Sequence, residues 1–247
     1  MRLLSFFLVI GISSIGSAQP AGKFPPDSLI NTHVIPKSTP VMDVVGTMRN
    51  FTSALGVRCQ FCHVGQEGQP LAQFDFASDQ KRNKLVARQM MRMVADINKR
   101  LDTIPARSEP PVAATCMTCH RGVSRPIPLS QLVQETAVSV SADSAISAYK
   151  ILRQRYYGRD AYDFSEPSLS IAAFRTARAG KPDEALKLIH YNEGLYPNSS
   201  GMSVFKGNIH LMKGDTTAAE AAFREAIRRD STNTEARGRL QAIGRKP

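Results

Sequence analysis

All four cysteines of this 247-residue chain lie in two copies of one pattern, Cys-x-x-Cys-His. The copies are Cys59-Gln60-Phe61-Cys62-His63 and Cys116-Met117-Thr118-Cys119-His120. Two thiols separated by two residues on one turn can each form a thioether bond to a vinyl group of a single porphyrin, and the following His then brings an imidazole to the iron. The pattern predicts two covalently bound haem c groups, with thioether bonds to Cys59, Cys62, Cys116 and Cys119 and with His63 and His120 as axial ligands.

Three other uses of these cysteines compete with haem attachment. Four thiolates can hold zinc, but 53 residues separate Cys62 from Cys116, which exceeds the usual spacing, and both histidines would have no role. A redox-active thiol pair normally accompanies a strand-helix-strand pattern, which this sequence lacks. Two structural disulfides are compatible with an exported protein.

The N-terminus has the pattern of a secretory signal peptide. Arg2 is followed by an apolar run from Leu3 to Ile15, and Gly16-Ser17-Ala18 supplies small residues for cleavage after Ala18. The run is shorter than the roughly 20 residues of a spanning helix, and no later segment is apolar enough to span. The sequence therefore predicts a bacterial periplasmic protein, with peripheral membrane contact at most, in the compartment where haem attachment takes place.

A helix is expected from Thr39-Pro40, with Thr39 as the N-cap and Pro40 at the first helical position, to a stop at Gly56. Val44, Met48, Phe51 and Leu55 recur every three or four residues and form one apolar face. Met48 is placed to offer its thioether sulfur to the first iron. Spacing alone leaves open the alternative that Met48 only packs in a core.

A second helix is expected from Ser78 to about Asp102, followed by a Pro-rich connection to the second motif. Val86, Met90, Met93, Val94, Ile97 and Leu101 form its apolar face, and Met91 lies at the edge of that face. Met93 or Met90 is a candidate sixth ligand for the second iron, and His33 is a third candidate. Core packing for the methionines and a surface position for His33 are the alternatives.

Four ordered segments carry a resemblance to a known family. They are residues 47–51, residues 55–63, residues 92–98 and residues 116–122. Together they resemble the photosynthetic reaction-centre cytochrome c subunit, over roughly residues 29–128. In that family a Met eleven residues before the first Cys of a motif is an axial ligand, which implies this role for Met48. The resemblance also implies that Met93 lies at a ligand-bearing helix position.

The chain departs from that family in having two motifs where the family has four, and no lipid-anchoring Cys. It resembles the C-terminal half of the subunit. In the family, one haem of this half takes its sixth ligand from a His in the other half. The sixth ligand of the second haem is therefore Met93, His33 or water, and the resemblance does not decide between them. It also does not decide whether the protein serves photosynthesis.

The C-terminal part repeats with a period of 34 residues from Glu166 onward. Gly180 aligns with Gly214, and Ala185 with Ala219. Small residues at these positions, with Phe223, match the paired helices of tetratricopeptide repeats. Such repeats generally bind peptides or protein partners, and the alternative is an appendage that only stabilises or orients the first domain. His190 and His210 are expected to be packing or surface residues.

We therefore expect a mainly α protein: a dihaem c-type cytochrome domain followed by a short tetratricopeptide-like helical repeat domain. The expected boundaries are residues 1–18 for the signal peptide, 19–127 for the cytochrome domain, 128–165 for a linker with an extra helix at Asp143 to Tyr157, and 166–247 for the repeats with a capping helix.

Lys and Arg exceed Asp and Glu by 32 to 21, and this excess is spread over both halves of the chain. A spread-out excess in an exported chain argues against nucleic acid as a partner. A basic group on the second helix, Lys81, Arg82, Lys84, Arg88 and Arg92, is suited to haem propionates or to an acidic redox partner, or is simply solvated.

The leading functional hypothesis is an electron carrier between protein redox partners, with no catalytic residues. The first alternative is a dihaem peroxidase-type oxidoreductase with one open iron site. The second is a zinc-holding binding module without haem.

Overall fold

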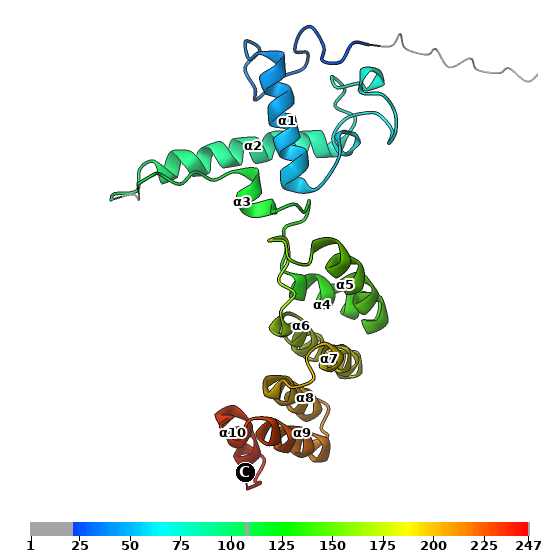
Figure 1. Ribbon diagram of the computed structural model, residues 1–247, viewed down its shortest axis with the longest axis vertical. Helices are drawn as coiled ribbons and strands as arrows, with labels where there is room; N and C mark the ends of the chain where they lie inside the picture. The colour runs from blue at the N-terminus through cyan, green and yellow to red at the C-terminus, as the bar shows by residue number, and fades with distance from the viewer. Residues whose placement is uncertain (1–21, 107–108, 247) are drawn as a thin grey trace, which may run out of the picture. The chain divides into compact units, whose positions relative to one another are not determined.

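The computed structural model describes residues 22–106 and 109–246, so the predicted signal peptide lies outside the described residues. Within these ranges the chain is mainly helical and contains no strand, only an isolated antiparallel bridge between Val64 and Asp75. The expected mainly α fold class is confirmed. The chain divides into two compact units, Met1–Cys116 and Met117–Pro247, and Figure 1 shows the helices of each.

The first unit contains two long helices, α1 (Val41–Leu55) and α2 (Arg82–Leu101), and two short 3-10 turns, η1 (Cys59–Phe61) and η2 (Leu71–Gln73). Its described part has almost no packed interior, because Ala54 is its one fully buried residue. Helix α2 buries none of its side chains, although its sequence is strongly amphipathic. The apolar faces of this unit therefore do not close on one another.

Helix α1 ends as predicted and begins one residue later than predicted. Gly56 is the C-cap with φ of 65°, a left-handed conformation that glycine adopts without a Cβ penalty. The N-cap is Pro40, and no side chain caps the first turn, so the expected capping role of Thr39 is not seen.

Helix α2 begins at Arg82, four residues after the predicted start at Ser78. The later start is explained by the contacts of Asp79. The Asp79 carboxylate binds Lys84 and Arg88 of the helix, as well as Asn31, and does not cap a first turn. The segment around Asp79 is thereby held in an extended course across the side of α2.

The second unit is built of packed helices around two clusters of buried hydrophobic side chains. They are α4 (Leu129–Ser139), α5 (Ala142–Tyr156), α6 (Glu166–Arg178), α7 (Pro182–Leu195), α8 (Ser200–Met212), α9 (Thr216–Arg229) and α10 (Thr234–Ala242). Helix α5 corresponds to the predicted extra helix. Helix α4 was not anticipated; it buries Leu129, Val133 and Ala137, which recur every four residues.

The predicted 34-residue period is visible in the helix starts. Helix α6 begins at Glu166, α8 at Ser200 and α10 at Thr234, while α7 begins at Pro182 and α9 at Thr216. The glycines that end α6 and α8, Gly180 and Gly214, have φ of 84° and 82°. The second unit is thus a stack of helical hairpins, and its assignment to the tetratricopeptide class stays a prediction.

Candidate functional site

The first Cys-x-x-Cys-His motif forms a single tight turn directly after α1. Turn η1 covers Cys59–Phe61, and the backbone N–H groups of Cys62 and His63 donate to the Cys59 carbonyl over 3.2 and 3.0 Å. This places both thiols and the imidazole on one compact loop, as the thioether chemistry of the motif requires. The thiols of Cys59 and Cys62 are half-buried and are not joined in a disulfide.

The N-terminal end of α2 clamps this turn. Lys81 Nζ donates to the carbonyl of Gln60 over 2.9 Å, and Asn83 Nδ2 donates to the carbonyl of Phe61 over 3.1 Å. Turn carbonyls that would otherwise lack partners are satisfied in this way, and the turn is fixed to the helix. Sequence reasoning did not identify Asn83, because nothing in a local pattern shows which distant carbonyl an Asn will meet.

A cavity of about 1040 Å³ lies beside the first motif and within the first unit. Cys59, Cys62 and His63 line it from the motif, Met48 and Phe51 from α1, and Ala87 and Met91 from α2. Its volume is at the upper end of the usual range for small-molecule and cofactor sites, roughly 300–1,000 Å³. The faces of α1 and α2 that do not close on one another are therefore walls of one cavity.

His63 is held at the cavity wall in a state suited to metal binding. Its ring meets the Phe76 ring edge-on, with centroids 4.9 Å apart, and its Nδ1 is buried without a hydrogen-bond partner. Burial lowers the pKa of His63 below its ordinary value, and the positive charges of Lys84 and Arg88 lower it further. The neutral imidazole, which is the form that coordinates iron, is thereby favoured.

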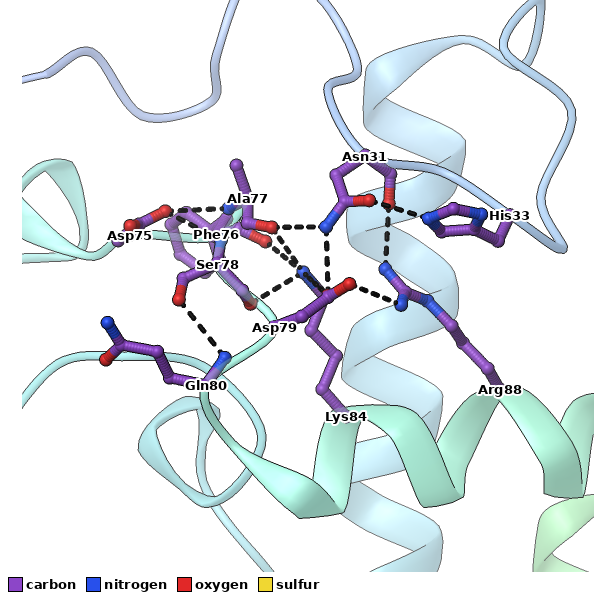
Figure 2. A network of polar contacts seen from close by, with 10 residues as sticks. All are labelled: Asn31, His33, Asp75, Phe76, Ala77, Ser78, Asp79, Gln80, Lys84 and Arg88. Carbon is purple, nitrogen blue, oxygen red and sulfur yellow. Dashed lines mark hydrogen bonds and ion pairs between the residues drawn. The ribbon is translucent and has the colours of Figure 1, made fainter.

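Some of the candidate sixth ligands line the first cavity, and others are exposed on α2. Met48 is half-buried and lines the cavity together with His63. His33 lines the same cavity, beside the first motif, and its Nε2 donates to Asn31 Oδ1 over 2.7 Å (Figure 2). Met91, at the edge of the predicted apolar face, is also at this wall, whereas Met93 and Met90 are 46% and 38% exposed on α2.

The second motif forms the short helix α3 (Cys116–His120). His120 Nδ1 lies 2.9 Å from the carbonyl oxygen of Val123, and because a carbonyl only accepts, Nδ1 carries the proton. The Nε2 lone pair is then available for iron, which is the usual arrangement of a metal-binding His. The turn that brings Val123 back passes through Arg121 and Gly122, with φ of 49° and 89°.

The C-terminal end of α2 clamps the approach to the second motif. Asn98 Nδ2 donates to the carbonyl of Ala114 over 2.9 Å, and Ala114 N–H donates back to Asn98 Oδ1 over 2.7 Å. The side-chain amide thus pairs with the backbone two residues before Cys116. Helix α2 therefore holds the first motif with its first turn and the lead-in to the second motif with its last turns.

The first motif fits a haem c group. Two thiols, an imidazole with an unpartnered buried nitrogen and a methionine meet at one cavity, and almost no side chains fill the interior of the unit. In residues 22–106 and 109–246 there is no cluster of three or more His, Cys, Asp or Glu side chains arranged to hold a metal ion on its own.

Comparison with known proteins bears on the whole of α2 and on the second motif. Residues 69–154 match the family model of the photosynthetic reaction centre cytochrome C subunit. The predicted resemblance to this family is confirmed. The matched residues begin after the first motif, include Cys116–His120, and continue through α4 and most of α5.

A curated relative agrees with this match. The photosynthetic reaction center cytochrome c subunit of Thermochromatium tepidum is 34% identical over 99 residues, which are 36% of this chain and 23% of that protein. This chain thus matches about a quarter of the length of the relative. Both findings name c-type cytochromes, for which haem c is the cofactor. Among the helices of the described residues, none combines the length and the apolar character needed to cross a membrane.

Proposed function

We propose that this protein is an exported electron carrier with two haem c groups, which passes single electrons between protein redox partners. The first haem is bound through Cys59 and Cys62 with His63 and Met48 as axial ligands. The second is bound through Cys116 and Cys119 with His120 as one axial ligand, and Met93 is the candidate for the other. His33 is kept as a lower-ranked alternative ligand.

One observation carries the proposal: the thiols of Cys59 and Cys62, the imidazole of His63 and the sulfur-bearing Met48 line one cavity. Bound haem supplies the one-electron redox chemistry. The chain's residues attach it, present a neutral imidazole, and limit the access of water with the aromatic wall of Phe74 and Phe76, whose rings stack 5.7 Å apart. A methionine opposite a histidine favours a higher potential and fills the position that bond-making chemistry would need.

The helical second unit and export belong to the same proposal. The stack of α6 to α9 is suited to docking a protein partner, and residues 1–18 are suited to delivering the chain to the periplasm, where haem is attached.

Haem counting tests the proposal. Protein matured in a host with haem-attachment machinery should give two haems per chain in a pyridine haemochrome spectrum. The Cys59→Ser/Cys62→Ser and Cys116→Ser/Cys119→Ser variants should each give one. A chain that holds no haem, or that binds one zinc through its cysteines, would contradict the proposal.

Ligand tests separate the carrier from the peroxidase-type alternative. Met48→Ala should abolish a methionine–iron charge-transfer band, whereas Met42→Ala should leave it intact, because Met42 is 58% exposed on the same helix and does not line the cavity. A carrier should bind little carbon monoxide when reduced and should turn over little hydrogen peroxide. Rapid peroxide turnover would favour the alternative.

A further inference from the structure

Two cations of α2 stand on the wall of the first cavity. Lys84 Nζ donates to the carbonyls of Phe76, Ala77 and Ser78, each over 2.9 Å. Arg88 donates from Nη2 to the carbonyl of Asn31 over 2.9 Å and from Nη1 to Asp79 over 2.9 Å. Both cations line the cavity, as does His63; Figure 2 shows how they converge on Asp79 and the 76–78 segment.

The side chains of these cations are largely shielded from solvent, in contrast to those of Arg82 and Arg92 in the basic group predicted from the sequence. The side chains of Lys84 and Arg88 are 11% and 13% exposed, whereas Arg82 and Arg92 are exposed. Charges removed from water interact more strongly with their surroundings, because the local dielectric is low and salt does not screen them well. The pair is therefore fixed in position, and solvent screens its field only weakly.

Two carboxylates lie near these cations. Asp79 binds both cations, but its side chain is 38% exposed and does not line the cavity. Asp75 does line it, and its Oδ1 accepts hydrogen bonds from the N–H groups of Ala77 and Ser78. The two cations are thus part of the cavity lining, while their ion-pair partner Asp79 is not.

His63, the proposed iron ligand, lines the same cavity as these two cations. A haem held at Cys59–His63 would therefore lie beside two positive charges that solvent screens little. A positive field favours an added electron on a redox centre.

We propose that Lys84 and Arg88 raise the reduction potential of the haem held at Cys59–His63, and that Asp79 moderates this effect. The inference rests on the proposed function, since it requires a haem at the first motif. Lys84 and Arg88 act as positioning and electrostatic residues: they are held by backbone carbonyls and by Asp79, and they stabilise the reduced state through space.

Charge variants of opposite sign test this inference. In the full haem-loaded chain, Arg88→Gln should lower the midpoint of one haem in a spectroelectrochemical titration. The expected size is on the order of a tenfold change in the ferrous-to-ferric ratio at a fixed potential, or about 59 mV for a one-electron couple. Asp79→Asn should move the same midpoint upward, by less, because Asp79 is partly exposed to solvent.

Two further variants complete the design. Arg88→Lys keeps the charge and should restore most of the wild-type midpoint. Lys99→Gln removes an exposed cation of α2 that does not line the cavity, and it should leave both midpoints unchanged. The reduction midpoint that shifts in Arg88→Gln should be the same one that shifts in Met48→Ala. This agreement would assign the shifted midpoint to the haem at the first motif.

The possible outcomes are distinct. If Arg88→Gln and Asp79→Asn shift the midpoint in the same direction, the residues act only through structure and the inference is overturned. It is equally overturned if neither variant shifts a midpoint while two haems are present. A missing haem at the first motif in the wild-type protein would instead contradict the proposed function, and the haemochrome spectrum shows which has happened.

Discussion

Gly207 of α8 lies against the Phe223 ring of α9 in the second unit. A Cβ atom built on Gly207 would stand 2.7 Å from Cδ1 of Phe223, a ring that is completely buried. The sequence predicted small residues and Phe223 at this helix contact, and the structure shows the contact itself. The space between the Gly207 Cα atom and the Phe223 ring holds a hydrogen atom but no larger group.

Gly207→Ala should therefore destabilise the second unit, by about 1–3 kcal/mol, because the Phe223 ring must leave its packed position. Urea unfolding followed by circular dichroism would measure the change. Gly238→Ala on α10 is the matched control. Its Cβ would meet nothing within 4 Å, and alanine in a helix is favoured over glycine by about 0.5–1 kcal/mol, so this variant should be slightly more stable. Equal effects of the two variants would contradict the packing argument.

Residue types with a local signature were predictable from the sequence. The two motifs, Gly56 as a helix stop and Met48 on the apolar face of α1 depend on neighbours within one or two turns. Contacts between residues far apart in the sequence were not predictable. Examples are the pairing of Asn98 with Ala114 and the position of His33 at the first cavity. Both depend on the path of the loops that bring these residues together, and residue spacing carries no information about that path.

At the scale of helices, α2 is the element that holds both Cys-x-x-Cys-His motifs. Asn83 holds the turn of the first motif, and Asn98 holds the backbone that leads to the second. The expected start of α2 at Ser78 was wrong because Asp79, a good capping residue, makes tertiary ion pairs with two side chains of the helix. Local capping preference yields when such partners are available. Helix α4 was missed because it is short and no side chain caps its first turn.

Asn98→Ala should release the approach to the second motif. It removes both hydrogen bonds to Ala114 and leaves that backbone pair to find other partners, at a cost of about 1–3 kcal/mol. Hydrogen exchange at the Ala114 amide should accelerate by at least tenfold. Asn83→Ala is the control: it should leave Ala114 exchange unchanged, because its bond is to Phe61. Unaltered exchange at Ala114 in Asn98→Ala would show that the clamp is not energetically coupled to this segment.

The end of α9 carries an acid-sensitive ion cluster. Glu225 accepts hydrogen bonds from Arg228 over 2.6 Å and from Arg229 over 2.7 Å, and these bonds lower the pKa of Glu225 from 4.5 to about 2. Because the folded-state pKa is depressed, the stabilisation is fully present above pH 4.5 and is lost as the pH falls toward 2. Arg229 also donates to the carbonyl of Ser199, which ties α9 to the start of α8.

Glu225→Gln should accordingly be less stable than wild type at pH 7, and most of this difference should be gone at pH 2. Urea midpoints at both pH values would show the convergence. Glu235→Gln, whose carboxylate lies 3.6 Å from Arg239, should show a smaller difference at pH 7. A difference between Glu225→Gln and wild type that is the same at pH 7 and pH 2 would exclude the ionic origin of the effect.

At the scale of the whole molecule, the two units differ in what fills them. The second has two clusters of buried hydrophobic side chains, the larger of which includes Tyr149, Leu169 and Ile189, each fully buried. The first has Ala54 as the one buried residue of its described part. A chain of this length buries much of its apolar surface in order to offset the conformational entropy of folding. The first unit lacks that burial from its own side chains, and the proposed covalent haem would supply the missing interior.

In the haem-free chain, the second unit should consequently be folded, whereas the helices of the first unit should be unstable. In the variant with all four cysteines replaced by Ser, amides of α1 and α2 should exchange nearly as fast as in an unfolded peptide. Amides of α6 to α9 should stay protected by a factor on the order of a thousand or more. In the haem-loaded wild type, both sets should be protected. Strong protection of α1 and α2 without haem would mean that their side chains alone stabilise the unit, and that the cavity beside His63 is not where a structural cofactor completes the fold.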